Sequence, residues 1–191
     1  MRAMTWWDHE TRSIWSQPWG RAIEGPLKGT RLEMIPARIM PWKAWLEDYP
    51  RTLLLDTSSW VFQAPGALFN DKTIIGVTLG EFAKAYPWGP AGRAGVINDW
   101  VGPFPVVVFA DEVSKAVYVY SRQLGDRELE FSLSDGRPVD RQTGSTWDIA
   151  RGIALDGPLR GKVLRQLPYM SAYRWAWEDF YPHSEFYGES P

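Results

Sequence analysis

The fold is decided by a stretch of 45 residues, Asp140–Ser184, which reads DRQTGSTWDIARGIALDGPLRGKVLRQLPYMSAYRWAWEDFYPHS. A second stretch, Asp8–Thr52, reads DHETRSIWSQPWGRAIEGPLKGTRLEMIPARIMPWKAWLEDYPRT and aligns with it without a gap, at a constant offset of 132 positions. Sixteen of the 45 paired residues are identical, whereas unrelated segments share about one residue in fifteen at average amino-acid usage. The sequence therefore contains an internal repeat.

The identical positions are mainly Gly, Pro, Trp, Thr and Ser, which turn a chain or fill a core. Each copy begins with an aspartate, Asp8 or Asp140, followed by Thr and Ser at the same spacing. An Asp in this position accepts hydrogen bonds from backbone amides two or three residues further on. We therefore interpret the repeat as a folding unit used twice. Function is expected where the copies differ, or in the unrepeated middle.

Glycine spacing and apolar periodicity predict the elements of each copy. Closely spaced glycines favour short strands and turns over helices, and the predicted strands are Arg21–Glu24, Arg31–Ile35, Ile153–Leu155 and Val163–Leu167. Helical spacing of apolar residues predicts short helices over Pro41–Tyr49 and Ser171–Phe180, the second with Ser171 as N-cap. Thr52–Asp56 is predicted as a strand and Ser58–Lys72 as a loop or linker.

The unrepeated middle, residues 73–136, is rich in β-branched and alternating segments. Its predicted strands are Thr73–Val77, Glu81–Tyr86, Gly95–Val101, Phe104–Ala110, Ala116–Ser121 and Glu128–Leu133, with Gly125-Asp126 as the turn between the last two. Pro87–Pro90 is predicted to be a loop. We expect one domain over residues 1–191, of α+β class and mainly β. It should be barrel- or sandwich-like, with a pseudo-two-fold repeat of short strands plus a short Trp-rich helix.

Composition excludes several classes of function. The chain has no cysteine and two histidines, a net charge of −2 and a pI of about 5.7. Thiol chemistry and Cys-type metal sites are therefore excluded, and a multi-His metal site is nearly excluded. A hard-cation site built from carboxylates remains open, although neither a metal nor another cofactor is expected. A nucleic-acid partner is not expected at this charge. Without an apolar run of membrane-spanning length or a signal-peptide pattern, the sequence predicts a cytoplasmic protein with no membrane partner.

Twelve tryptophans are the unusual feature of the composition. Four recur in both copies and are expected in the core: Trp15, Trp45, Trp147 and Trp177. Some of the other eight are expected to line a groove or an interface. The second copy follows a predicted hairpin, whereas only seven residues precede the first. This difference predicts either a sheet edge near the N-terminus that forms a homo-oligomer, or a shortened form of a longer protein.

The chain resembles the bacterial and archaeal family catalogued as domain of unknown function 3179. The resemblance rests on Asp8–Gln17 with Gly20, Ala22-Ile23 and Gly25–Leu27, and on Ala85–Pro87, Val96–Asp99, Arg122 and Thr143–Ser145. It implies no established activity. Longer members resemble this chain extended by N-terminal strands that would complete the first copy. Many members carry a Cys-Pro-x-Cys-like element where this chain has Phe109–Ser114, so a thiol or metal role of that element is absent here.

Two sets of residues are candidates for chemistry. Matched aspartates can share a proton in a two-fold site, which makes Asp140 a catalytic candidate, although capping of a local turn is the favoured interpretation. The second set lacks identical partners in the repeat and contains the catalytic candidates Asp99 and Asp148 and the ligand-binding candidates Tyr86, Asn98 and Arg122. Such side chains in one cleft would bind a polar or anionic small molecule. The alternative interpretation makes Asn98-Asp99 a turn and Arg122 an edge-strand charge.

His9 and His183 do not pair with each other in the repeat and are expected to lie in solvated loops. The sequence leaves open whether the protein is an enzyme. The leading hypothesis is a soluble module that binds a ligand, such as a small polar molecule, or a partner, in an aromatic-lined groove between the repeats. The alternatives are a cysteine-independent hydrolase that uses carboxylates, and a structural subunit that forms an oligomer.

Overall fold

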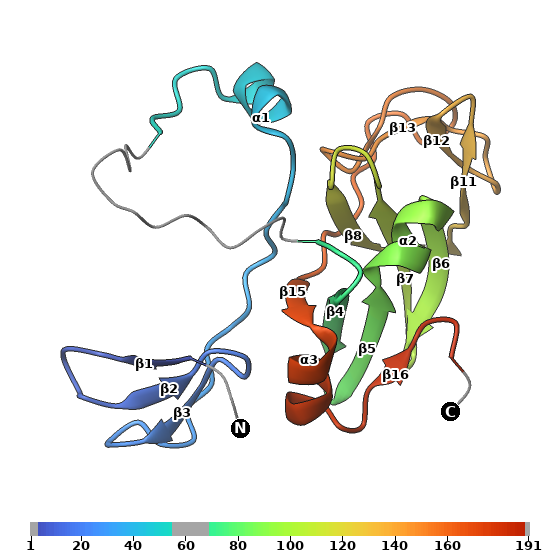
Figure 1. The fold of residues 1–191 in the computed structure, drawn as a ribbon. Coiled ribbons are helices and arrows are strands. Elements are labelled where there is room, and N and C mark those ends of the chain that lie inside the picture. The colour runs from blue at the N-terminus through green and yellow to red at the C-terminus, as the bar shows by residue number, and fades with distance from the viewer. Residues whose placement is uncertain (1–3, 55–68, 190–191) are drawn as a thin grey trace.

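Two sheets, one antiparallel and one mixed, form the centre of the molecule. The computed structural model describes residues 4–54 and 69–189. The first sheet has the order β6 (Val96–Val101), β7 (Phe104–Ala110) and β8 (Val117–Ser121). The second has the order β15 (Met170–Tyr173), β4 (Thr73–Leu79), β5 (Phe82–Pro87) and β16 (Glu185–Phe186), in which β16 runs parallel to β5. Figure 1 shows both sheets beside each other.

Three clusters of buried apolar side chains pack on the faces of these two sheets. The largest combines one face of β6–β8 with side chains of β4 and β5, and includes Ile75, Val77, Val106 and Val108. The opposite face of β7 and β8 packs on the later part of the chain through Val107, Phe109, Tyr120, Phe131 and Trp147. Helix α3 (Arg174–Phe180) covers the other face of β4–β5 with Trp177. Apolar side chains on both faces explain why β7 reads as an almost continuous apolar run.

The remaining elements of the body are short. Helix α2 (Trp88–Ala94) joins β5 to β6. Three two-stranded ladders follow β8: β9 (Gln123–Leu124) with β10 (Arg127–Glu128), β11 (Phe131–Ser134) with β12 (Arg137–Asp140), and β13 (Trp147–Asp148) with β14 (Ile153–Ala154).

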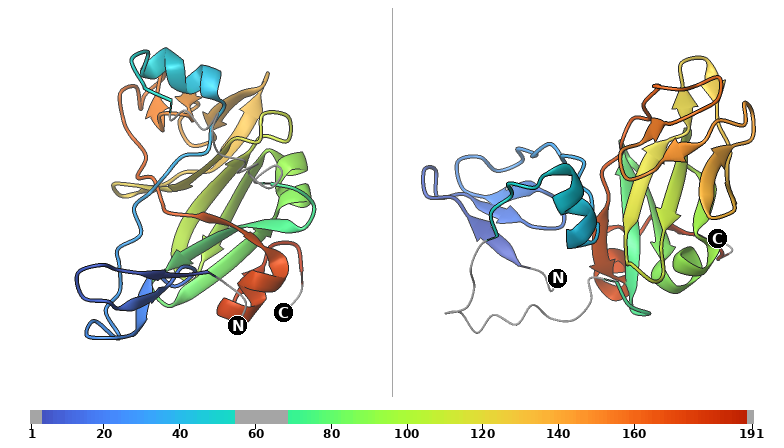
Figure 2. Two further views of the ribbon diagram at one scale, coloured as in Figure 1. Left: turned by 60° about the vertical axis from the view of Figure 1, so that its left-hand side comes forward. Right: turned by 90° about the horizontal axis from the view of Figure 1, so that it is seen from above.

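The N-terminal segment stands beside this body. Strands β1 (Thr5–Trp7), β2 (Ile14–Ser16) and β3 (Arg21–Glu24) form a small sheet, and helix α1 (Trp42–Asp48) follows. Figures 1 and 2 show the β1–β3 sheet and α1 on one side of the molecule. The connecting segment touches the body at Ile39, whose N–H donates to Tyr169 Oη at 3.0 Å and whose C=O accepts from Val117 N at 3.1 Å.

The structure is mainly β with three helices and several small sheets, as the composition and patterning predicted. Within residues 4–54 and 69–189, no sheet closes into a barrel, so that part of the expectation was wrong. Within the same ranges, no helix is long and apolar enough to cross a bilayer.

Proline accounts for one difference from the predicted elements. Pro87–Pro90 was predicted as a loop, but Pro87 precedes helix α2, with φ −55° and ψ 132°, and Pro90 lies in the first helical turn. A proline there lacks only an N–H that has no intrahelical partner, so it does not break the helix. The prolines mark a helix start that was misread as a loop.

Sheet pairing accounts for the second group of differences. Ser171 is not the N-cap, because it lies in β15 and pairs with Ile75 of β4. Helix α3 begins three residues later, without a side-chain cap. The strand predicted over Thr52–Asp56 is absent over residues 52–54, and its remainder lies outside the described residues. Arg31–Ile35 and Val163–Leu167 make isolated bridges only. The Gly125-Asp126 turn exists, but it joins β9 to β10, whereas β8 pairs with β7.

Candidate functional site

The carboxylates of Asp8 and Asp140 each organise a turn. Asp140 accepts from Thr143 N at 2.7 Å, from Thr143 Oγ1 at 2.9 Å and from Trp147 Nε1 at 3.0 Å. Asp8 accepts the equivalent bonds from Thr11 N, Thr11 Oγ1 and Trp15 Nε1, at 2.6, 2.9 and 2.9 Å. These bonds use the carboxylates to hold backbone and indole in place, as the turn-capping interpretation expects.

Each turn is locked to a glycine-rich loop by a serine. Ser145 Oγ accepts from Leu159 N at 3.0 Å, and Ser13 Oγ accepts from Leu27 N at 3.1 Å. The loops come so close that a Cβ on Gly157 would lie 2.7 Å from the Ser145 Cα. Gly157 also has φ +85°, which side chains rarely adopt. This glycine is therefore required by both space and backbone conformation.

The two aspartates differ in burial. Asp140 is fully buried, whereas Asp8 is half-buried. Hydrogen bonds from the Trp15 indole, and then from Thr11, lower the pKa of Asp8 from 3.8 to about 2. The two carboxylates share no hydrogen-bond partner among the described residues, since each is held by its own turn.

Asp99 and Tyr86, two of the other candidates, lie together beside Lys84. Lys84 Nζ lies 2.9 Å from Asp99 Oδ2 and 3.3 Å from Glu185 Oε2. Tyr86 is completely buried and its hydroxyl has no hydrogen-bond partner among the described residues. Burial raises the pKa of Tyr86, and the charge of the nearby Asp99 raises it further. The cluster thus contains one buried, neutral phenol next to an ion pair.

Arg122 joins this cluster from the other side and is 3% exposed. Its Nε donates to Val106 O at 2.9 Å, its Nη1 to Leu129 O at 3.0 Å, and its Nη2 to Asp99 O at 3.1 Å. Nη1 also pairs with Glu128 Oε1 at 2.7 Å. The interpretation of Arg122 as an edge charge was therefore wrong, because the guanidinium ties three backbone segments together.

Asn98 and Asp148 have separate roles. Asn98 lies in β6 rather than in a turn, and its side-chain amide both donates to Phe131 O and accepts from Phe131 N, each at 2.8 Å. This pair of bonds replaces a strand ladder between β6 and β11. Asp148 pairs with Arg151, which also contacts Asp48, well outside the Tyr86 cluster. The candidates Asp99, Tyr86 and Arg122 are thus brought together, and Asp148 is not.

A groove of about 670 Å³ lies where the N-terminal segment meets the β4–β5 hairpin and the end of α3. Four aromatic residues line it, namely Trp19, Phe82, Phe180 and Tyr181. Trp19 Nε1 donates to Phe180 O at 3.1 Å, and Tyr181 Oη donates to Pro18 O at 2.8 Å. The indole of Trp19 and the Phe180 ring meet edge-to-face at 5.3 Å. These contacts join the N-terminal segment to the end of α3.

The charged residues of the groove are mostly cationic. The backbones of Arg21 and Arg31 form an isolated antiparallel β-bridge, and both side chains are exposed at the groove. Neither guanidinium forms an ion pair with a carboxylate of the described residues. His183 and Glu81 also line the groove, and His183 is exposed as predicted. Burial raises the pKa of Tyr181, while the charge of Arg31 lowers it. The groove therefore presents unpaired cations beside aromatic rings.

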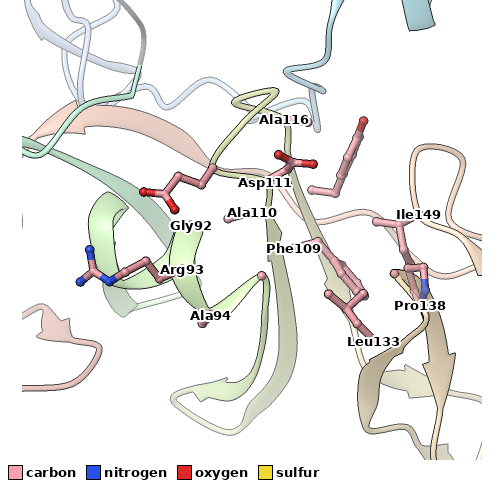
Figure 3. A pocket seen from close by; sticks show the side chains of 14 residues that line it. Gly92, Arg93, Ala94, Phe109, Ala110, Asp111, Ala116, Leu133, Pro138 and Ile149 are labelled. Atoms are coloured by element: carbon pink, nitrogen blue, oxygen red, sulfur yellow. The ribbon is translucent and has the colours of Figure 1, made fainter.

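A second pocket of about 400 Å³ lies at the end of β7, and Figure 3 shows its side chains. Phe109, Leu133 and Ile149 supply apolar contacts, Arg93 lies on the opposite side, and Asp111 lies between them beside Ala116 in this view. The pocket includes the start of Phe109–Ser114, the segment that stands in the place of the Cys-Pro-x-Cys-like element described above. However, Asp111 Oδ1 already accepts from the backbone N–H groups of Val113 and Ser114, at 2.8 and 2.9 Å. That carboxylate serves the loop itself.

Neither pocket is lined by Asp99, Asp140, Asp148, Tyr86, Asn98 or Arg122. Sequence reasoning missed the groove residues, although Trp19 belonged to the unpaired tryptophans expected in a groove. Arg21 and Arg31 carried no signal, since a bridge between them depends on the turn at Gly25 and Gly29. Over the described ranges, no three His, Asp or Glu side chains gather in a way that could hold a metal ion.

The chain matches one protein-family model twice. The model is described as "Protein of unknown function (DUF3179)", and the matches cover residues 2–63 and 61–184. Comparison with curated proteins and with solved structures gave no match. Since the two matches together cover most of the sequence, the chain belongs to the DUF3179 family.

Proposed function

We propose that this member of the DUF3179 family is a binding module whose ligand site is the groove between two copies of one folding unit, residues 8–52 and 140–184. The copies share their sequence pattern and make the same aspartate and serine hydrogen bonds. Each also lies within a separate match to the same family model. The contacts of Trp19 and Tyr181 join the two copies at the groove.

The observation that carries the binding proposal is the pair of guanidiniums beside aromatic rings. Arg21 and Arg31 have no carboxylate partner in the described chain, in a protein whose net charge is −2. Guanidiniums bind carboxylates through charge-assisted hydrogen bonds, and aromatic walls bind apolar rings. The ligand proposed is therefore a small anion with an apolar or aromatic part.

The hydrolase alternative has less support. Asp99 and Glu185 share Lys84, but this cluster does not line either pocket described above. Asp140 is committed to its turn by three hydrogen bonds. A carboxylate that acts on a substrate must reach it at hydrogen-bond distance.

Saturation-transfer NMR with phenylacetate tests the binding proposal. Phenylacetate should bind, whereas the neutral and nearly isosteric phenylacetamide should bind at least about tenfold more weakly, because it lacks the charge that the guanidiniums select. The variant Arg31→Gln should weaken phenylacetate binding by a similar factor. The matched control is Arg127→Gln, an exposed arginine in β10 outside the groove, which should leave binding unchanged. Equal binding of both ligands, or equal effects of both variants, would refute the proposal.

A further inference from the structure

The pocket at the end of β7 shares no lining residue with the ligand groove and differs from it in charge. We propose that this pocket binds a small organic cation, an ammonium group carried on an apolar or aromatic stem. The proposal goes beyond the groove, whose arginines would repel such a ligand. The cavity, the contacts that fix its walls and the carboxylates at its rim each support this assignment.

Apolar side chains form the floor of the pocket, which has a volume of about 400 Å³. Phe109, Ala116 and Ile149 line it and are 5, 6 and 8% exposed. Leu133 lines it from the β11–β12 hairpin and remains 49% exposed. Figure 3 shows Phe109, Leu133 and Ile149 gathered on one side of the cavity. A hollow of this size with an apolar floor suits the stem of a small molecule.

The walls of the cavity are fixed by contacts within the protein. The side-chain amide of Asn98 bonds to the N–H and the C=O of Phe131, each at 2.8 Å, which holds β11 against β6. Two residues further along β11, Leu133 Cδ1 would lie 3.3 Å from a Cβ added to Gly95, so the hairpin closes tightly on the end of α2. A cavity with fixed walls loses little conformational entropy when a ligand fills it. Asn98 therefore holds one wall of the pocket, although it does not line it.

Two exposed carboxylates at the rim supply negative charge. The turn that Asp111 organises uses only Oδ1, which accepts from Val113 N and Ser114 N and so holds the side chain in place. The other oxygen, Oδ2, accepts no hydrogen bond from the residues that the structure describes. The Glu112 carboxylate has no ion-pair partner within 4–54 and 69–189. A fixed carboxylate oxygen beside an apolar cavity favours a cation that can donate a hydrogen bond to it.

The cationic side chain among the lining residues, Arg93, is directed away from the cavity. Its Nη1 would lie 3.3 Å from a Cβ added to Gly89, one helical turn back along α2. Figure 3 shows the Arg93 side chain on the side away from the apolar floor. The nearby Lys115 does not line the pocket, and its Nζ lies 5.1 Å from the centroid of the Trp88 ring. The charge that the cavity presents is therefore negative.

Two aromatic side chains, Phe109 and Tyr118, complete the lining. The electron-rich faces of aromatic rings attract cations. Tyr118 is half-buried, and its hydroxyl makes no hydrogen bond with another described residue. Burial raises the pKa of Tyr118, and the charge of Asp148 raises it further, so the phenol is neutral and its oxygen can accept from an ammonium. These groups match an arylalkylamine such as phenethylamine, which is protonated at neutral pH.

Amide chemical-shift mapping with phenethylamine tests the assignment on the full chain. Shifts should appear at lining residues such as Ala94, Ala116 and Leu133, and their titration gives the dissociation constant. 2-Phenylethanol, which has a neutral hydroxyl in place of the ammonium, should bind at least about fivefold more weakly. No binding of phenethylamine at millimolar concentration, shifts confined to the groove, or equal affinity for both molecules would each overturn the inference.

Two variants locate the site. Ala94→Leu enlarges an exposed lining residue of α2, so the affinity for phenethylamine should fall about tenfold or more. The melting temperature should change little, because leucine is a good helix former. Glu112→Gln removes one charge and should weaken binding about two- to fivefold, as expected for an exposed ion pair. The matched control is Glu47→Gln, exposed in α1 and outside the pocket, which should leave binding unchanged.

Full affinity in Ala94→Leu would show that the cavity is not the site. Equal losses in Glu112→Gln and Glu47→Gln would show that only the net charge of the protein attracts the amine, which also overturns the inference. Phenylacetate is titrated beside phenethylamine on the same variants. Arg31→Gln should weaken phenylacetate alone and Glu112→Gln phenethylamine alone, so either proposal can fail without the other.

Discussion

Removal of the Asp140 carboxylate should destabilise the protein strongly, whereas removal of Asp8 should cost less although it breaks the same hydrogen bonds. In Asp140→Ala, the Trp147 indole N–H loses its partner in a completely buried site, and the Thr143 amide loses its partner at half-buried depth. A buried donor without a partner costs about 1–3 kcal/mol. The expected loss is therefore about 2–4 kcal/mol. At the half-buried Asp8 turn, water can replace the carboxylate.

Urea unfolding followed by tryptophan fluorescence measures both variants. With an m-value of about 2 kcal/mol/M, the midpoint of Asp140→Ala should fall by about 1–2 M. Asp140→Asn retains one acceptor oxygen and should fall between the wild type and the alanine variant. Equal midpoint shifts for Asp8→Ala and Asp140→Ala would refute the reasoning, because burial would then not determine the cost. A midpoint unchanged in Asp140→Ala would remove the structural role of this carboxylate.

Three further predictions concern titration and buried polar groups. Because hydrogen bonds lower the pKa of Asp8 to about 2, its ionised form stabilises the native state above about pH 4, and this contribution is lost as the pH falls from 4 to 2; Asp8→Asn should flatten the melting-temperature profile over that range. Arg122→Met should cost about 3–5 kcal/mol in urea unfolding, since it leaves buried backbone acceptors and Glu128 without their donor, and a loss below about 1 kcal/mol would contradict it. Tyr86→Phe removes a buried hydroxyl that has no hydrogen-bond partner among the described residues, so calorimetry should show equal or slightly higher stability; a marked loss would show that the hydroxyl is bound to Asp99.

The sequence predicted most of the strands because their signals are local. Apolar, β-branched runs bounded by glycine and proline identified β4, β6 and β7 to within two residues at each end. The aspartate turns were also predictable, since an Asp and its Thr and Ser lie within five residues of one another. Trp177 is buried as predicted, because its ring packs over Gly76 of β4, whereas Trp45 is only half-buried and its prediction as a core residue was wrong.

The differences arise where a partner distant in the sequence decides the outcome. Ser171 has a residue type typical of an N-cap, but pairing with β4 extends a strand through it. Arginine is a residue type usually found at the surface, but backbone carbonyl groups of three segments accept hydrogen bonds from the buried Arg122. No local pattern reports such convergence. Arg21 and Arg31, which line the groove, become neighbours only through a turn, so no local pattern predicted them.

The long-range contacts of Ile39 and Tyr181 have a consequence for the order of folding. They join residues 130 positions apart, Ile39 with Tyr169, and 163 positions apart, Tyr181 with Pro18. Closing such loops is entropically costly and slow compared with forming hairpins such as β4–β5 or β6–β7. The body should therefore form first and the N-terminal segment should join it last. By the same argument that segment is the first cooperative unit to open, so a protease under native conditions should cleave it while residues 69–189 remain intact.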